Sequence, residues 1–143
     1  MKKIPYEIGK VKIRKTGTDL TIVSYSKTML TVEKAAEKLE EEGISAEVID
    51  LITLSPWDKE TVLRSVQKTG RLLIAHEAVK QGGFGGEIAA TVAEEGFSYL
   101  KAPVSRIAAP FVPVPFAPEL EEQVRVHVED IVNKAKELIN EDK

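Results

Sequence analysis

His76 and Glu77 are adjacent residues of a kind that could work as an acid–base pair. They follow a short apolar run, 72–75, which is typical of a strand covered on both faces of a sheet. Neighbouring residues on a strand point to opposite faces, so both could serve one substrate only if the strand ended between them. We therefore favour a hydrogen-bonded structural role for His76 over a direct catalytic role, and we assign no catalytic residue.

A glycine-rich segment follows at once, Gly82-Gly83-Phe84-Gly85-Gly86, and apolar residues then return at helical spacing from Ile88. Free amides at the start of a helix can bind an anion. The segment lacks the spaced glycine pattern of a dinucleotide-binding loop, and no Lys-Ser/Thr follows as in a P-loop. A tight turn against a sheet also requires glycine. We favour the turn, keep anion binding as an alternative, and assign no cofactor-binding residue.

A proline-rich apolar segment, 110–116, contains Phe111, Pro113, Pro115 and Phe116. Its prolines cannot sit inside a helix or a central strand, so we expect an extended arm on the surface. A monomer normally covers apolar surface of this kind, which favours a subunit contact. Arg106, in the predicted strand before the arm, is expected to reach a sheet edge or to pair with a carboxylate.

The amino-acid composition argues against several classes of function. The 143 residues are 43% apolar and 30% charged, which is typical of one soluble domain. The net charge of −3, with mixed signs throughout, argues against nucleic acid as a partner. The absence of cysteine excludes disulfides, iron–sulfur clusters and thiolate catalysis, and two histidines argue against a histidine-rich zinc site, so we assign no metal ligand. No apolar run approaches the roughly 20 residues that span a bilayer, so we expect no membrane partner. The absence of cysteine is compatible with the cytoplasmic location that we expect.

The order of predicted elements indicates an α/β fold with an open sheet. Residues 1–7 are expected to be a linker and 8–143 a single domain. Ser55 or Asp58 could cap the helix that starts near Pro56. The predicted elements are an edge strand near 10–14, strands at 20–25, 46–51, 72–75 and 104–109, and helices at 28–42, 56–69, 84–97 and from 118 onward.

Several motifs together resemble the C-terminal domain of the beta subunit of 2-oxo acid dehydrogenase decarboxylating components. The resemblance extends from Ile8 to the last helix. The Pro-Trp-Asp, His-Glu-Ala, Gly-Gly-Phe and Pro-Phe-Ala-Pro stretches make it most like the branched-chain 2-oxo acid type. The motifs are Ala-Glu-Val-Ile-Asp-Leu (46–51), Leu-Ser-Pro-Trp-Asp (54–58), residues 65–74, His-Glu-Ala (76–78), Gly-Gly-Phe (82–84), residues 102–107 and Pro-Phe-Ala-Pro (115–118).

The resemblance implies a three-layer α/β/α fold of the transketolase C-terminal type, with a mostly parallel five-stranded sheet and one antiparallel edge strand. In this family the alpha subunit and the N-terminal domain of the beta subunit hold thiamine diphosphate and a divalent cation, and no part of this chain resembles those parts. We therefore expect a domain that binds no cofactor and is inactive alone. Its parent oxidoreductase would decarboxylate a branched-chain 2-oxo acid and pass the acyl group to a lipoyl arm.

The resemblance also implies partners for this domain: a second beta subunit, an alpha subunit and a lipoyl acyltransferase core, in a homodimer or a heterotetramer. Phe111 departs from the family, whose members commonly carry Asp before the Pro-x-Pro of the arm. Pyruvate- and acetoin-type relatives, the equivalent domain of transketolase or deoxyxylulose phosphate synthase, and a free-standing anion-binding module remain alternatives. We expect the chain to be either an isolated piece of a longer subunit or a split-gene product.

Overall fold

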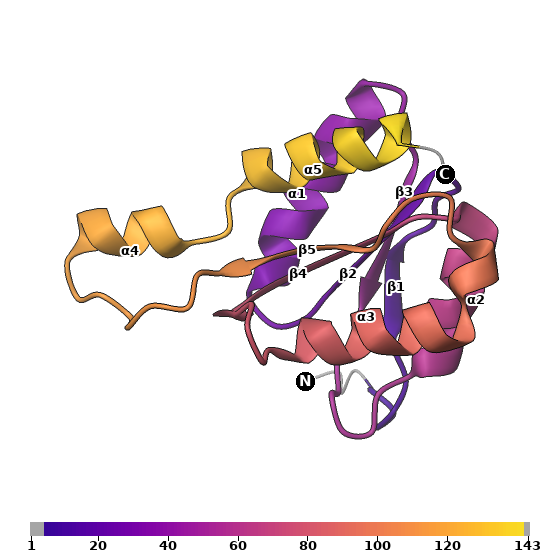
Figure 1. Ribbon diagram of the computed structural model, residues 1–143, viewed down its shortest axis with the longest axis horizontal. Coiled ribbons are helices and arrows are strands. Elements are labelled where there is room, and N and C mark those ends of the chain that lie inside the picture. Colours follow the sequence, from indigo (N-terminus) through magenta and orange to yellow (C-terminus); the bar gives the residue numbers. More distant parts are fainter. Residues whose placement is uncertain (1–4, 142–143) are drawn as a thin grey trace.

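The computed structural model describes residues 5–141, which form a five-stranded sheet between two layers of helices (Figure 1). Within these residues the strand order is β1-β3-β2-β4-β5; β1 is antiparallel to β3 and the other neighbours are parallel. This confirms the predicted three-layer α/β fold. The strands are β1 (Lys12–Lys15), β2 (Leu20–Ser24), β3 (Ala46–Asp50), β4 (Leu72–Val79) and β5 (Ser105–Ala109).

Helices cover both faces of the sheet, and one helix projects away from it. One face carries α1 (Thr28–Glu41) and α5 (Val128–Asn140), and the other carries α2 (Lys59–Thr69) and α3 (Phe84–Glu95), followed by the 3-10 turn η1 (Phe97–Tyr99). The short helix α4 (Pro118–Val124) lies outside these layers, beyond the end of β5 (Figure 1). No described helix is long and apolar enough to cross a membrane.

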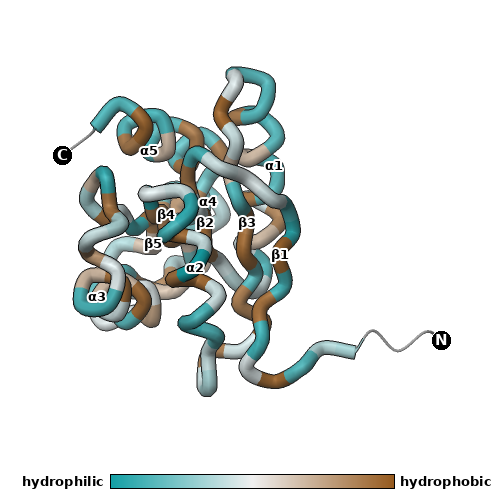
Figure 2. Tube along the Cα trace, turned by 90° about the vertical axis from the view of Figure 1, so that its right-hand side faces the viewer, coloured by the Kyte–Doolittle hydropathy of each residue, from teal (hydrophilic) through white to brown (hydrophobic). Residues whose placement is uncertain are grey.

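The core lies on both faces of the central strands. Successive side chains of a strand alternate between faces, so a strand covered on both sides must be apolar throughout. In β2, Ile22 packs with the α1 and α5 layer and Val23 with the α2 and α3 layer; Val48 and Ile49 of β3 repeat this alternation. Figure 2 shows the apolar residues along the inner strands and polar residues on the outer surfaces of α1 and α5.

Asp58 caps α2, which decides between the two candidate caps. Its carboxylate accepts from the Thr61 amide at 3.2 Å and from the Val11 amide at 3.2 Å, so it also holds the chain that enters β1. Burial would raise the pKa of Asp58, but the donors from Thr61 and Val11 outweigh it and lower this pKa. Pro56 precedes the helix in a cis peptide bond, so its predicted place at the first helical position is wrong.

The last predicted helix is in fact two helices, α4 and α5, separated at residues 125–127. The His127 amide donates to the Asp130 carboxylate at 3.0 Å, and its ring Nε2 lies 2.8 Å from the Glu122 carbonyl oxygen. The apolar stripe continues across this break, which is why periodicity alone suggested one helix. Histidine is also not among the preferred cap residues.

Strand β4 is longer than predicted, because it continues past Ala75 to Val79. His76 and Glu77 therefore lie within the strand and not at its tip. Of the predicted linker 1–7, residues 1–4 lie outside the described residues, and residues 5–7 have no regular structure.

Candidate functional site

His76 joins the end of β4 to the first turn of α3. Its side chain is buried, with 1% of its surface exposed, whereas Glu77 is exposed, so the structure does not bring the two residues together as an acid–base pair, the less favoured of the two interpretations. Nδ1 of His76 lies 3.0 Å from the Ala78 carbonyl oxygen, and Nε2 lies 3.1 Å from the Gly85 amide nitrogen. The ring of Tyr25 packs beside the imidazole at a centroid distance of 5.8 Å.

These contacts define the protonation state of His76. The Gly85 N–H can only donate, so Nε2 must accept and the proton of the neutral ring lies on Nδ1, which donates it to Ala78. Burial lowers the pKa of His76, the Ala78 carbonyl opposes this, and the positive charge of Arg106 lowers it further. Since both ring nitrogens are occupied within the protein, the arrangement gives His76 a positioning role.

The imidazole and the Val79 carbonyl explain two glycines of the loop. A Cβ on Gly85 would lie 2.7 Å from Nε2 of His76, and a Cβ on Gly83 would lie 2.3 Å from the Val79 carbonyl oxygen. Both distances are shorter than nonbonded atoms tolerate. Gly82 has φ +73°, in the left-handed region that favours glycine. Packing and turn geometry therefore account for much of the glycine run.

The amides of this loop are largely used within the protein. Gly83 donates to the Lys80 carbonyl at 3.4 Å and Gly86 to the Gly83 carbonyl at 3.0 Å, in addition to the Gly85 bond to His76. The hollow over the loop is also lined by Glu87, whose negative charge opposes an anion. The anion-binding alternative thus loses most of the donors on which it depends.

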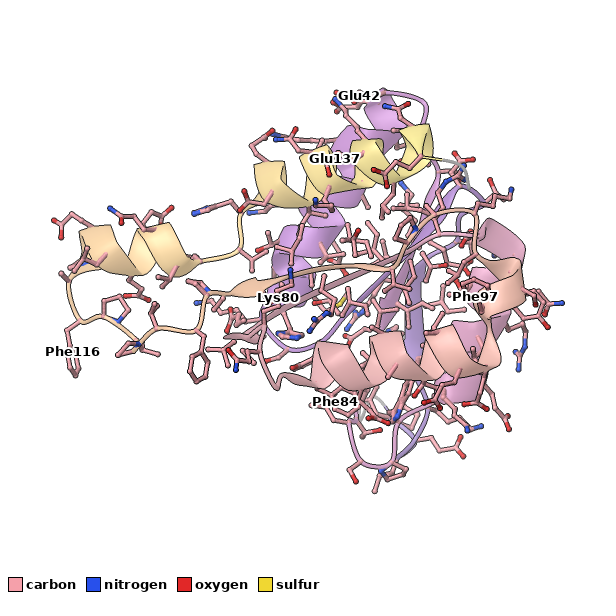
Figure 3. All side chains as sticks on the ribbon, viewed as in Figure 1. Glu42, Lys80, Phe84, Phe97, Phe116 and Glu137 are labelled. Carbon is pink, nitrogen blue, oxygen red and sulfur yellow. The ribbon has the colours of Figure 1, made fainter. Side chains whose placement is uncertain are left out.

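Two of the sequence motifs meet in space at the start of α2 and α3. The rings of Trp57 and Phe84 pack edge to face, with centroids 5.9 Å apart and an interplanar angle of 88°. Phe84 is the first residue of α3, and it lies beneath the sheet in the view of Figure 3. The Pro-Trp-Asp and Gly-Gly-Phe motifs are thus parts of one packed cluster.

A buried polar network lies between β2, β3 and α2, and it was not predicted. The carboxylate of Glu47, 2% exposed, accepts from Lys68 and, at 2.6 Å, from the Ser65 hydroxyl. The hydroxyl oxygen of Thr21 lies 2.6 Å from that of Ser65 and 2.8 Å from that of Thr69. Burial would raise the pKa of Glu47, but hydrogen bonds from Lys68, Ser65 and a backbone amide outweigh it and lower this pKa. The available signal was a carboxylate inside an otherwise apolar stretch of β3, which carries a second one, Asp50, at its end.

The arm, residues 110–116, is exposed. Phe111, Val114 and Phe116 are exposed by 70%, 83% and 102%, and Figure 3 shows Phe116 at the outer end of the molecule. Pro113 is exposed and Pro115 half-buried. The helix that follows, α4, has no buried residue. The predicted extended apolar arm is therefore present, and it leads away from the body of the domain (Figure 1).

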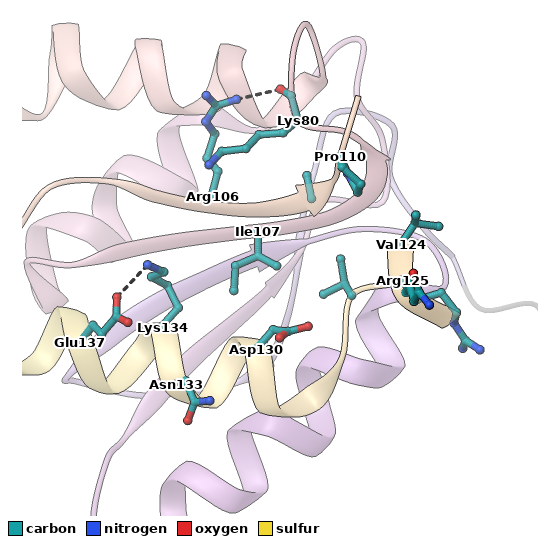
Figure 4. Close-up of a pocket in the computed structure, with 13 residues that line it drawn as sticks. Lys80, Arg106, Ile107, Pro110, Val124, Arg125, Asp130, Asn133, Lys134 and Glu137 are labelled. Atoms are coloured by element: carbon teal, nitrogen blue, oxygen red, sulfur yellow. Dashed lines mark hydrogen bonds and ion pairs between the residues drawn. The ribbon is translucent and has the colours of Figure 1, made fainter. Parts of the chain in front are cut away.

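Beside the arm, a cavity of about 390 Å³ lies along β5 (Figure 4). Arg106 reaches the sheet edge, as predicted, and its Nη1 donates to the Lys80 carbonyl at 3.0 Å. No sequence pattern brings the other lining residues together, because they come from β5, α4, α5 and loop segments. They include Lys80, Ile107, Ala108, Pro110, Val124, Arg125, Asp130, Asn133, Lys134 and Glu137.

The fold and these motifs match a known family. The sequence pattern of the transketolase C-terminal domain matches residues 9–131, which include every strand of the described sheet. The chain belongs to the transketolase C-terminal domain family. A split-gene transketolase, described as an inactive beta4 tetramer, has a structure similar to this domain, with a TM-score of 0.85 and 28% identity over 98% of this chain and 45% of that chain.

Within that family, the likeness to beta subunits of 2-oxo acid dehydrogenases is confirmed. The transketolase C-terminal domain described here is 52% identical, over 129 residues, to the pyruvate dehydrogenase E1 component subunit beta-1 of Arabidopsis thaliana, covering 90% of this chain and 36% of that protein. It is 50% identical, over 108 residues, to the 2-oxoisovalerate dehydrogenase subunit beta 2 of the same plant, covering 76% and 30%. The chain therefore spans about a third of these relatives. Their similarity does not single out the branched-chain type.

The carboxylates of this transketolase C-terminal domain do not fit the metal-bound cofactor that the resemblance implies. Buried Asp50 pairs with Arg14 at 2.8 Å, and buried Glu47 and Asp58 are engaged as described above. No group of three or more His, Asp or Glu side chains within residues 5–141 is arranged to hold a metal ion.

Proposed function

We propose that this chain is the assembly domain of the beta subunit of a thiamine-diphosphate-dependent 2-oxo acid dehydrogenase. It contacts a second beta subunit, the alpha subunit and the lipoyl acyltransferase core, and other parts of the parent enzyme hold thiamine diphosphate and its divalent cation. The parent enzyme oxidatively decarboxylates a 2-oxo acid and transfers the acyl group to a lipoyl arm. In this proposal the domain works in the cytoplasm and has no turnover of its own.

The observation that carries this proposal is the exposed arm. Phe111 and Phe116 have large, exposed apolar side chains that a partner would cover. Removing this surface from water would stabilise the contact by about 25 cal/mol per Å² of apolar area. The arm and α4 together form a projection with little packing of its own, which is expected of an interface segment. The similar split-gene transketolase is described as an inactive beta4 tetramer, which matches self-association without turnover.

The substrate class is the finer part of the proposal. The motifs around Trp57, His76 and Phe84 favour a branched-chain 2-oxo acid, whereas pyruvate dehydrogenase subunits are similar over more of the chain. The parent enzyme, reconstituted with its alpha subunit, should turn over 3-methyl-2-oxobutanoate with a higher kcat/KM than pyruvate. The reverse order would assign the domain to a pyruvate dehydrogenase and leave the assembly role intact.

The assembly role is tested by using the tagged chain as bait in an extract of its source organism and identifying captured proteins by mass spectrometry. A dehydrogenase alpha subunit or a lipoyl acyltransferase should be recovered. The matched control is the double variant Phe111→Ser/Phe116→Ser, which keeps the core residues and should lose the beta-subunit contact. Recovery of neither protein class by the unchanged chain would contradict the proposal. Turnover of a 2-oxo acid by the isolated chain with thiamine diphosphate would contradict it as well.

A further inference from the structure

The two edges of the described sheet are built differently. Edge strand β1 reads Lys-Ile-Arg-Lys, and such charges discourage a further strand from pairing there. Edge strand β5 reads Ser-Arg-Ile-Ala-Ala and carries one charge, Arg106. Every residue of β5 is partly exposed, whereas β2 and β3 are buried throughout. In the described sheet β5 pairs with β4 alone, so its outer backbone groups are open to another strand.

The cavity described above runs along this open edge. Figure 4 views β5 with Arg106 and Lys80 on one side, α5 on the other and the end of α4 beside it. Three successive residues, Arg106, Ile107 and Ala108, contribute to its wall. A groove along the free edge of a sheet is the geometry in which an extended peptide adds a strand.

The arm has the sequence of a strand that can pair along one edge only. In an extended chain the backbone groups of alternate residues point to the same edge. Pro113 and Pro115 therefore remove donors from one edge, while Val114 and Phe116 keep their N–H groups on the other. The Val112 N–H lies on that same edge but donates to the Pro110 carbonyl at 2.8 Å, so Val114 and Phe116 are the donors left for a partner strand. Proline in sheets is confined to edge strands, where its missing N–H faces solvent. Such a strand would extend a sheet by one and then stop further growth.

We propose that the arm of a second copy of this chain adds as a sixth strand to the open edge of β5, reciprocally in the two copies. This inference rests on the proposed assembly role and specifies its beta–beta contact. A chain cannot place its own arm on its own β5, because the arm starts at Pro110, directly after β5 ends, and leads away to α4 (Figure 1). Two identical chains can exchange arms, since each has one open edge and one arm.

Charge also favours this occupant. The groove is lined by four basic side chains, Lys80, Arg106, Arg125 and Lys134, against two acidic ones, Asp130 and Glu137. Lys134 pairs with Glu137 at 2.7 Å and Arg125 with Glu122 at 3.3 Å, so the excess positive charge comes from Lys80 and Arg106 against Asp130. The arm itself carries no charge, and the α4 segment directly after it carries three carboxylates and no cation. An arriving arm thus brings apolar residues to the edge of β5 and negative charge to a groove with excess positive charge.

Two variants at one position test the backbone pairing. Val114→Pro removes a donor from the pairing edge of the arm, and Val114→Ala keeps that donor while shortening the side chain. Sedimentation of each purified chain should show dimerisation weakened by Val114→Pro at least about tenfold more than by Val114→Ala, since a reciprocal dimer loses two hydrogen bonds, one in each copy. Because Val114 is exposed, circular dichroism should give the same folded spectrum for both variants.

Hydrogen exchange supplies the second readout. In the unchanged chain, β5 amides should become protected as protein concentration rises, and Val114→Pro should abolish this rise. Equal effects of the two variants would overturn the inference, as would a dimer whose β5 amides exchange at the same rate at every concentration. A chain that stays monomeric at every concentration would overturn it too. Capture of the alpha subunit from extract is a separate result, so the assembly role stands or fails independently of this pairing.

Engineered cysteines report the contact directly, since the chain has none of its own. An Ala108→Cys chain, mixed with a Val112→Cys or a Val114→Cys chain, should form a disulfide between copies, because cysteines pair only when their Cα atoms come within about 7 Å. Lys34→Cys, on helix α1 remote from β5, is the control partner and should not cross-link with Ala108→Cys. Equal cross-linking to Lys34→Cys and to the arm would contradict strand addition.

Discussion

Nε2 of His76 lies 3.1 Å from the amide nitrogen of Gly85 and accepts its hydrogen. This bond ties the end of β4 to the first turn of α3, and it requires a neutral imidazole. Protonation of His76 at Nε2 would place the N–H of the ring against the N–H of Gly85. The contact therefore couples the position of the glycine loop to the charge of one buried histidine.

Stability should consequently fall in mild acid. Burial holds the pKa of His76 below its ordinary value of 6.5, so the unfolded chain binds a proton more readily than the folded chain. The contribution of the neutral ring to the free energy of unfolding is complete above pH 6.5 and is lost as pH decreases toward the folded pKa. Urea unfolding at a series of pH values measures this loss. His76→Gln, which cannot titrate, should show a smaller slope between pH 7 and pH 5, and an unchanged slope would contradict the assignment.

Two alanine substitutions in the first turn of α3 should have opposite effects. Gly85→Ala places a Cβ 2.7 Å from the His76 ring and should destabilise the domain by about 1–3 kcal/mol through overpacking. Gly86→Ala meets only Arg106 at 3.5 Å and should stabilise it by about 0.5–1 kcal/mol, because alanine is the better helix residue. Thermal or urea unfolding measures both values. Equal effects of the two substitutions on stability would show that the His76 ring does not restrict the size of the side chain at position 85.

The buried carboxylate of Glu47 should depend on its lysine. Lys68→Met leaves this carboxylate buried without its cation and should cost about 1–3 kcal/mol of unfolding free energy. The matched control is Lys59→Met, which removes an exposed pair with Glu95 at 3.1 Å and should cost less than about 0.5 kcal/mol. Urea unfolding of the two variants at neutral pH compares them. A cost for Lys59→Met equal to that for Lys68→Met would contradict this role of Lys68.

Much of the fold was predictable, because local patterns determine it. Gly70, with φ +75°, follows α2 directly, in agreement with the helix predicted to end at 69. The edge strand predicted near 10–14 corresponds to β1, whose charges are typical of a sheet edge. The break between α4 and α5 was missed because the apolar periodicity continues through it. The extension of β4 was missed because His76 and Glu77 are polar and therefore suggested a strand end.

The details of the site could be predicted only in part. The types of residue at 76 and 82–86 suggested a turn against the sheet, but the bond from Gly85 to His76 depends on how far β4 extends before the chain reverses. The contact of Glu47 with Ser65 and Lys68 joins a strand to a helix that packs on it, and no local spacing specifies such a pair. The groove along β5 likewise combines residues from separate elements.

In the proposed assembly role, the exposed arm holds two copies of this chain together. Sedimentation equilibrium of the purified chain, compared with Phe111→Ser/Phe116→Ser, tests it most directly. Both side chains are exposed, so the variant should keep the fold, which circular dichroism can check. We predict a mass above that of the 15.8 kDa monomer for the unchanged chain, rising with concentration, and a monomer for the variant. A monomer in both cases, or the same oligomer in both, would contradict self-association through the arm.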